Sequence, residues 1–309
     1  MSVILVFYKY VIIREKGSKM IKILIVLILL VVVFVFWQRW ELTKFEVNDY
    51  VIESEKIKEE QHAVVIADLH GFSYGEQNQR LLQQIEKRHP KIILIPGDLI
   101  VSKYSETFHV ALEFLKNLVQ IAPVYYSFGN HETRLREEKR KNHKAFETYM
   151  SEVEKLGVKV LNNESVSLKD WEGVRIIGLE LPIEYYEKGR IVSMAENNLK
   201  DFLPKPAGEA FGILLAHNPA YAQQYAAWGA DVTFCGHNHG GLIRIPGVGS
   251  LLSPQLTFFP KYDAGRFEFG DKNVIVSRGL GTHTFHIRIF NRAELLDIRF
   301  VPRNSRECI

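Results

Sequence analysis

Five short groups of potential metal ligands occur in order along this chain, each at the end of an apolar run. They are Asp68-x-His70, Gly97-Asp98, Gly129-Asn130-His131-Glu132, His217-Asn218 and Gly236-His237-Asn238-His239. Carboxylate, imidazole and amide groups favour Mn²⁺, Fe or Zn²⁺ over Ca²⁺ or a thiolate-bound metal. Two such metals about 4 Å apart can polarise a phosphoryl oxygen and supply a nucleophile. The ordered set therefore predicts a hydrolytic centre with two divalent metal ions.

The elements that precede these groups must bring them to one place. The apolar runs are Ala63–Ala67, Ile92–Ile95, Val124–Phe128, Gly212–Ala216 and Val232–Cys235. Short continuous apolar runs are typical of strands buried on both faces. In open α/β sheets, ligands bind beyond the carboxyl ends of the strands. We therefore expect the five groups to meet at one edge of the fold.

The rest of the chain alternates strands with helices. Apolar residues at helical spacing predict helices over Glu76–Arg88, Glu106–Val119, Lys139–Leu156 and Pro219–Trp228. Further strands are expected over Val174–Leu179 and Asn273–Ser277, and the chain beyond Leu242 is richer in strands and turns. This alternation predicts one layered α/β domain over residues 61–309.

An uninterrupted apolar run, Ile23–Trp37, marks the N-terminal segment. We predict a transmembrane signal anchor over residues 20–40, because aromatic side chains end the run and no small-residue cleavage site follows it. A cleaved signal peptide and a buried core helix are the alternatives. Residues 1–19 form a basic segment that could be an over-long start ahead of Met20, and residues 41–60 are expected to form a linker.

The charge of the chain is concentrated in this leader. Residues 1–44 carry a net charge of +5 and the remainder carries −2. Basic residues before the span predict a cytoplasmic N-terminus and an extracytoplasmic catalytic domain in the cell membrane. The balanced remainder lacks the basic footprint of a nucleic-acid-binding protein. The two cysteines, Cys235 and Cys308, do not make a disulfide framework, and the sequence indicates no oligomeric state.

The five groups resemble the calcineurin-like metallophosphoesterase superfamily, whose pattern is D-x-H, G-D, G-N-H-[DE], H and G-H-x-H. The resemblance covers the chain from about Val64 onward. It implies a layered β-sandwich flanked by helices, in the order α/β/β/α. The anchor, the Gly-His-Asn-His-Gly-Gly stretch and the segment Ser277–Gly281 resemble the bacterial membrane-associated branch of the family.

The resemblance also implies a role for each residue. Asp68, His70 and His239 would bind the first metal ion, and Asn130, His217 and His237 the second. Asp98 would bridge the two ions, which agrees with the need for a carboxylate there. His131 would contact the substrate phosphate and assist departure of the leaving oxygen. The Gly97-Asp98-Leu99-Ile100 stretch lacks the acidic residue that some relatives place nearby, which bears on the substrate pocket.

The implied activity is metal-dependent hydrolysis of phosphomono- or phosphodiesters. A membrane anchor favours lipid-linked or envelope substrates, of which a diacylglucosamine pyrophosphate is one. The alternative is a membrane-tethered metal-binding module without catalytic activity. Several residues keep two interpretations: His283 and His286 lie in the cleft or on the surface, Arg278 and Arg288 bind phosphate or support the fold, and Glu132 and Asp263 support the site from behind or face solvent.

Overall fold

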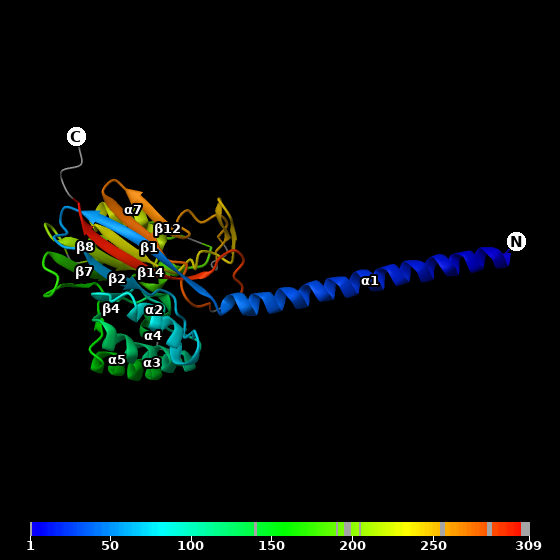
Figure 1. Cartoon of the computed structure of the whole chain (residues 1–309), viewed down its shortest axis with the longest axis horizontal. Coiled ribbons are helices and arrows are strands. Elements are labelled where there is room, and N and C mark those ends of the chain that lie inside the picture. The colour runs from blue at the N-terminus through cyan, green and yellow to red at the C-terminus, as the bar shows by residue number, and fades with distance from the viewer. Residues whose placement is uncertain are drawn as a thin grey trace. The chain divides into compact units, whose positions relative to one another are not determined.

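A computed structural model of the chain describes residues 2–138, 141–189, 191–194, 199–203, 205–253, 257–282 and 286–303. The chain divides into two compact units, Met1–Thr43 and Lys44–Ile309. The first unit is a single helix, α1 (Ser2–Leu42), drawn in blue in Figure 1. By length and composition, Lys19–Leu42 is apolar enough to cross a membrane, and its apolar side chains from Met20 to Phe36 are exposed.

The prediction that residues 41–60 form a linker is wrong. α1 continues to Leu42, and β1 (Phe45–Ser54) then pairs in parallel with β14 (Ala293–Pro302) along its whole length. The acidic residues of this segment conceal a strand pattern, in which Phe45 and Val47 pack against one hydrophobic cluster and Tyr50 and Ile52 belong to another. An edge strand tolerates such charges because one of its sides faces water.

The second unit is built on two six-stranded sheets. The first sheet has the order β1-β14-β2-β3-β4-β5, and the second has the order β12-β13-β9-β8-β7-β6. The remaining strands of the first are β2 (Gln61–Val65), β3 (Ile92–Ile95), β4 (Val124–Tyr126) and β5 (Lys159–Val160). The strands of the second are β6 (Glu164–Ser167), β7 (Val174–Leu179), β8 (Phe211–Ala216), β9 (Val232–Cys235), β12 (Gly265–Phe269) and β13 (Lys272–Val276). A separate ribbon pairs β10 (Ile243–Ile245) with β11 (Gly249–Leu252).

Short helices connect these strands. They are α2 (Gln79–Glu86), α3 (Glu106–Ile121), α4 (Asn130–Glu138), α5 (His143–Lys155), α6 (Leu199–Phe202) and α7 (Ala222–Trp228), with 3-10 turns η1 (Glu76–Asn78), η2 (Ile183–Tyr186) and η3 (Pro219–Tyr221). The predicted helix starts at Lys139 and Pro219 differ from the observed α-helices. Residues 139–140 lie outside the described residues, and the proline begins a 3-10 turn ahead of α7.

Alternating side chains of the strands divide the core into three layers. Val65 of the first sheet and Ile213 of the second belong to one cluster between the sheets. Val64 points the other way and packs with residues of α2, α3 and α5, whereas Leu214 packs with residues of α7. Figure 1 shows α3, α4 and α5 beside the first sheet and α7 beside the second. The α/β/β/α sandwich implied by the sequence resemblance is therefore confirmed.

Candidate metal centre

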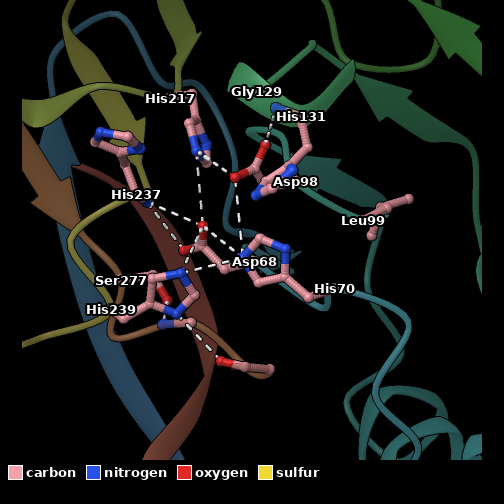
Figure 2. Close-up of polar contacts among 12 residues, drawn as sticks. Asp68, His70, Asp98, Leu99, Gly129, His131, His217, His237, His239 and Ser277 are labelled. Carbon is pink, nitrogen blue, oxygen red and sulfur yellow. Dashed lines mark hydrogen bonds and ion pairs between the residues drawn. The ribbon is translucent and has the colours of Figure 1, made fainter. Parts of the chain in front are cut away.

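The strand ends of both sheets converge on one buried centre. Asp68 and His70 follow β2, Asp98 follows β3, Asn130 and His131 open α4 after β4, His217 follows β8, and His237 and His239 follow β9. All eight side chains are 9% exposed or less. Figure 2 shows imidazoles from the two sheets facing one another across the carboxylates of Asp68 and Asp98. The convergence expected from the sequence is present.

Three overlapping groups within this centre have the ligand atoms of a metal site. They are Asp68, His70 and His239; Asp98, His217 and His237; and His70, Asp98 and His131, each with atoms within 4.8 Å of one another. Apart from Asn130, the first two groups contain the residues expected for the two separate ions. Asp98 shares one group with His217 and His237 and another with His70, so its carboxylate lies between residues expected for different ions.

Distances within the centre are those of side chains gathered around a shared point. The Nε2 atom of His217 lies 3.1 Å from Asp98 Oδ2 and 3.7 Å from Asp68 Oδ1. The Nε2 atom of His239 lies 3.7 Å from Asp68 Oδ1, and that of His70 lies 3.9 Å from an oxygen of each aspartate. These separations leave no room for a water molecule between the two atoms of each pair.

Backbone carbonyls fix the orientation of three of the imidazoles. The Nδ1 atom lies 2.8 Å from Pro96 O in His217, 3.1 Å from Gly281 O in His239 and 3.3 Å from Ile100 O in His70. Since a carbonyl can only accept, each Nδ1 carries a proton, and each ring keeps its lone pair on Nε2 when it is neutral. The Nε2 atoms of His70 and His239 face each other at 3.1 Å. Two lone pairs in this arrangement favour a cation between them.

Backbone strain is concentrated at the same residues. Of the eleven non-glycine residues with positive φ among those described, five are expected ligands: Asp68, His70, Asp98, His237 and His239. Such a left-handed conformation costs about 1–2 kcal/mol per residue. The backbone at Gly236 approaches Asp68 so closely that a Cβ on this glycine would lie 2.5 Å from Asp68 Oδ2. The fold therefore maintains an unfavourable local geometry in order to gather these side chains.

Asn130 supplies a direct test of whether the centre fits a metal ion. Its Oδ1 atom is buried and has no hydrogen-bond partner among the described residues. A buried amide oxygen without a partner costs about 1–3 kcal/mol, and a cation would satisfy it. The orphaned oxygen, the inward lone pairs and the two carboxylates together fit a divalent metal site, and the donor set suits Mn²⁺, Fe or Zn²⁺.

Electrostatics at the centre also favour added positive charge. Burial raises the pKa of Asp68 to about 7, a shift that His217 opposes and Asp98 increases. Burial alone would lower the pKa of His217, but the charge of Asp98 and the hydrogen bond to it raise this pKa to about 9. Although burial opposes it, the surrounding histidines hold the pKa of Asp98 well below its usual value. Without metal, the centre therefore retains protons near neutral pH.

We expect metal binding to tighten as the pH rises from about 6 to about 9, because ions must displace the protons on His217 and Asp68. In the metal-free protein, protonated His217 contributes stability below pH 6.5 that is lost as the pH rises through about 9. Calorimetric titration with Mn²⁺ in buffers of different ionisation enthalpy would count the released protons. A metal affinity that is independent of pH over this range would contradict the proton displacement.

His131 lies beside the expected ligands, but its ring accepts a hydrogen bond at Nδ1, where the other three rings donate one. The Nδ1 atom of this ring accepts the backbone N–H of Ser102 at 3.0 Å and lies 3.1 Å from the Ser102 hydroxyl. A neutral His131 therefore carries its proton on Nε2, where it can donate to a substrate oxygen. The backbone N–H of His131 also donates to Asp98 Oδ1 at 2.9 Å. Ser102 thus occupies the position of a partner for this histidine, where the sequence shows no acidic residue.

Glu132 is the residue whose importance the sequence interpretation underrated. Its Oε2 atom accepts the N–H groups of Asp98 and Gly129 at 3.0 Å, and its Oε1 atom accepts the Leu99 N–H at 3.0 Å and the Tyr126 hydroxyl at 2.7 Å. One buried carboxylate therefore joins the loops after β3 and β4. Burial and the charge of Asp98 raise the pKa of Glu132 to about 8, while the hydrogen bonds that its carboxylate accepts favour the ionised form.

Replacing Glu132 by glutamine is expected to lower the free energy of unfolding by about 3 kcal/mol, because an amide NH₂ would face backbone donors that both oxygens now accept. Chemical denaturation measures this change directly. The exposed Glu154 provides a matched Glu→Gln control that should leave stability within about 0.5 kcal/mol of the wild type. Equal stability of the two variants would show that Glu132 does not hold the loops.

Tyr186 is a further neighbour of the centre that no spacing in the sequence indicated. Its ring centroid lies 5.1 Å from that of His237 and 6.0 Å from that of His217. The hydroxyl is buried without a hydrogen-bond partner among the described residues, and the pKa of Tyr186 is raised by burial and by Asp98. The residue comes from η2, an irregular segment whose sequence carries no motif.

The other residues that the sequence left with two interpretations either support the fold or lie on the surface. Arg288 is buried and donates to the carbonyls of Arg278, Gly279 and Gly281, so it holds the loop that orients His239. Arg278 pairs with Glu294 and Glu46. Both arginines support the fold.

His286 is exposed and contacts Thr282, while His283 and Cys308 lie outside the described residues. Asp263 accepts the Ser250 N–H and pairs with Arg244, so it supports β11. Cys235 is a buried free cysteine at the end of β9.

The fold and the centre define a metal-dependent hydrolase in which a two-sheet sandwich presents histidine and carboxylate ligands at its strand ends. The profile of the calcineurin-like phosphoesterase family matches residues 62–241. That range includes every expected ligand, and the chain belongs to this family.

Three relatives illustrate the similarity. Phosphodiesterase YaeI of Escherichia coli (strain K12) is 29% identical over 217 residues, which cover 70% of this chain and 72% of that protein. A transmembrane protein with metallophosphoesterase domain from Danio rerio is 25% identical, over 82% of this chain and 56% of its own. UDP-2,3-diacylglucosamine pyrophosphatase LpxG of Chlamydia muridarum (strain MoPn / Nigg) is 31% identical, over 45% of this chain and 40% of its own.

Proposed function

We propose that this chain is a membrane-anchored phosphoesterase with two metal ions, acting on lipid-linked phosphodiesters or pyrophosphates. The observation that carries the proposal is the convergence of two carboxylates, an orphaned amide oxygen and four imidazoles beside His131, three of them oriented by backbone carbonyls. Asp68, His70 and His239 would hold one ion and Asn130, His217 and His237 the other, with Asp98 between them. When bound, the ions supply Lewis acidity and a nucleophile at neutral pH.

The chain's own residues account for the rest of the reaction. Ser102 fixes the His131 proton on Nε2, from which the ring can donate a hydrogen bond to the leaving oxygen or to the phosphoryl group. Glu132 keeps the Asp98 and Gly129 loops together, so the ligands do not need to reorganise. Burial of the whole group excludes water from the polar contacts and strengthens them.

Two observations support the membrane anchor and the substrate class. The apolar part of α1 is long enough to span a bilayer, and basic residues precede it, which favours a cytoplasmic N-terminus and an extracytoplasmic catalytic unit. The names of two relatives describe a phosphodiesterase and a pyrophosphatase of a diacylated glucosamine nucleotide. A phosphoester that carries acyl chains would be within reach of an anchored enzyme.

Phosphoester profiling of the full chain, reconstituted in lipid nanodiscs with Mn²⁺, Fe²⁺ or Zn²⁺ added back, tests the proposal. The panel should include aryl and alkyl phosphomonoesters, phosphodiesters and pyrophosphate diesters. We expect hydrolysis of at least one diester class and its loss on chelation. Stoichiometric metal binding without hydrolysis of any member would instead favour the metal-binding module without catalytic activity.

A further inference from the structure

Exposed apolar side chains of the unit from Lys44 onward gather on one region. Among the described residues of this unit, seven large apolar side chains are exposed, and five of them lie on three neighbouring segments. We call residues 243–252, 257–259 and 289–290 together the flap. The five side chains are Ile245, Val248, Phe258, Phe259 and Phe290, with exposed fractions from 39% to 69%. Concentrated apolar exposure of this kind marks a contact surface.

Backbone hydrogen bonds join the three segments into one piece. The Ile289 N–H donates to Leu242 O at 3.1 Å, and Ile289 O accepts the Arg244 N–H at 3.0 Å. The Phe259 N–H donates to Leu251 O at 3.2 Å. β10 and β11 pair with each other between these contacts. The exposed side chains therefore sit on a connected support.

Two of the exposed aromatic residues are also strained. Phe259 has a φ of 46° and Phe290 a φ of 50°. The left-handed region is unfavourable for bulky residues, and here it accompanies rings that are 59% and 69% exposed. Strain of this kind is concentrated at functional contacts. Neither local stability nor core packing explains why these two rings face outward.

The flap is attached to the metal centre. The Asn291 side-chain amide donates to the carbonyl of His239 at 2.7 Å, one residue beyond Phe290. The Asn238 side-chain amide donates to Tyr262 O at 2.7 Å, three residues beyond Phe259. A molecule held by the flap would therefore lie next to the loop that carries two of the expected ligands.

Chain connectivity limits what the flap can contact. Only Thr43 and Lys44 separate the end of α1 at Leu42 from the start of β1 at Phe45, a reach of about 11 Å at full extension. Phe45 pairs with Ala293, three residues after Phe290. A bilayer crossed by α1 would therefore have its surface close to this end of the flap.

We propose that the flap rests on the bilayer that α1 spans, with Phe258, Phe259 and Phe290 inserted among the lipids. The metal centre would then act on phosphoesters carried by membrane lipids, an inference that rests on the proposed function. Aromatic side chains favour the membrane–water interface. The exposed Lys261, whose ammonium lies 5.0 Å from the Tyr262 ring centroid, adds attraction for anionic headgroups.

Spin labels would measure the depth of the flap directly. The full chain, with Cys308→Ser as background, carries a label through Phe258→Cys, Phe290→Cys or Glu172→Cys in nanodiscs of phosphatidylethanolamine and phosphatidylglycerol. Glu172, whose side chain is 85% exposed, lies in the turn before β7 and serves as the aqueous control. We expect the two flap labels to be accessible to oxygen and protected from a water-soluble nickel complex, unlike the label at 172. Equal nickel access at all three positions would overturn the proposal.

Two substrates with the same leaving group distinguish a loss of membrane contact by the flap from a loss of catalytic activity at the metal centre. The combined variant Phe258→Ser, Phe259→Ser and Phe290→Ser should hydrolyse dioleoylphosphatidyl-p-nitrophenol about tenfold or more slowly than the wild type, and bis(p-nitrophenyl) phosphate within about twofold. Ile191→Ser, an exposed residue outside the flap, should change neither rate. Equal loss on both substrates, or on neither, would contradict the role of the flap. If the wild type hydrolyses neither substrate, the proposed function fails, while the spin labels still decide whether the flap meets the bilayer.

Discussion

Replacing Asp98 by asparagine should lower kcat/KM for a chromogenic phosphodiester by about 1,000-fold or more, equivalent to about 4 kcal/mol of transition-state stabilisation. The physical reason is its central place in the centre. Its Oδ2 atom lies 3.1 Å from His217 and 3.9 Å from His70, while its Oδ1 atom accepts the His131 N–H. A neutral amide would keep the shape but remove the charge that both ions need.

The same substitution should lower the bound metal from two ions per chain to one or fewer, measured by mass spectrometry of the purified protein. Far-ultraviolet circular dichroism should remain unchanged, since the backbone hydrogen bond to Oδ1 can persist. Asp297→Asn is the matched control, because that carboxylate pairs with Arg88 away from the centre. Wild-type turnover of the Asp98→Asn variant would show that Asp98 does not bridge the two ions.

Replacing His131 by alanine should lower kcat by about 100- to 1,000-fold and leave metal content unchanged. The loss should be largest for alkyl leaving groups, whose departing oxygen holds the most negative charge, and smallest for p-nitrophenol. The Ser102 N–H on Nδ1 supports this expectation, because it leaves the His131 proton on Nε2.

His109→Ala is the control for this experiment, since His109 is exposed on α3. Comparison of a series of leaving groups separates a hydrogen bond to the leaving oxygen from general disruption of the site. A loss of rate that is the same for alkyl and aryl esters would show that His131 positions the substrate without stabilising the leaving oxygen. Loss of metal would show that it is a ligand.

Strands could be predicted from the sequence where the pattern of apolar residues matches the burial of the strand in the fold. The runs Ile92–Ile95, Val174–Leu179 and Val232–Cys235 are strands with the predicted bounds, because most of their residues are apolar and all but Arg175 are buried. β1 was missed because an edge strand mixes charges into its pattern. Its pairing with β14 joins segments at opposite ends of the catalytic unit, and no local signal carries that information.

Some residues of the site could likewise be predicted from the sequence, and others could not. Dispersed ligands could be predicted from short motifs at strand ends, because the topology of parallel strands brings such ends together. Tyr186 could not, since its place beside His237 depends on the path of an irregular turn. Glu132 lies within a recognised motif, but the N–H groups of Asp98 and Leu99 that it accepts belong to the loop after β3, more than 30 residues away in sequence.

The flap shows a third kind of limit. Phe258 and Phe259 are apolar residues in a chain rich in them, and only the folded structure shows that they face outward. Both rings are exposed and Phe259 has a left-handed backbone, unlike the phenylalanines whose rings pack in the core. Composition alone would have assigned both to the interior.

Anomalous diffraction from crystals of the full chain grown with Mn²⁺ tests the central claim most directly. We expect two manganese peaks, one contacted by Asp68, His70 and His239, the other by Asn130, His217 and His237, with Asp98 contacting both. A single peak, or peaks away from these seven side chains, would contradict it.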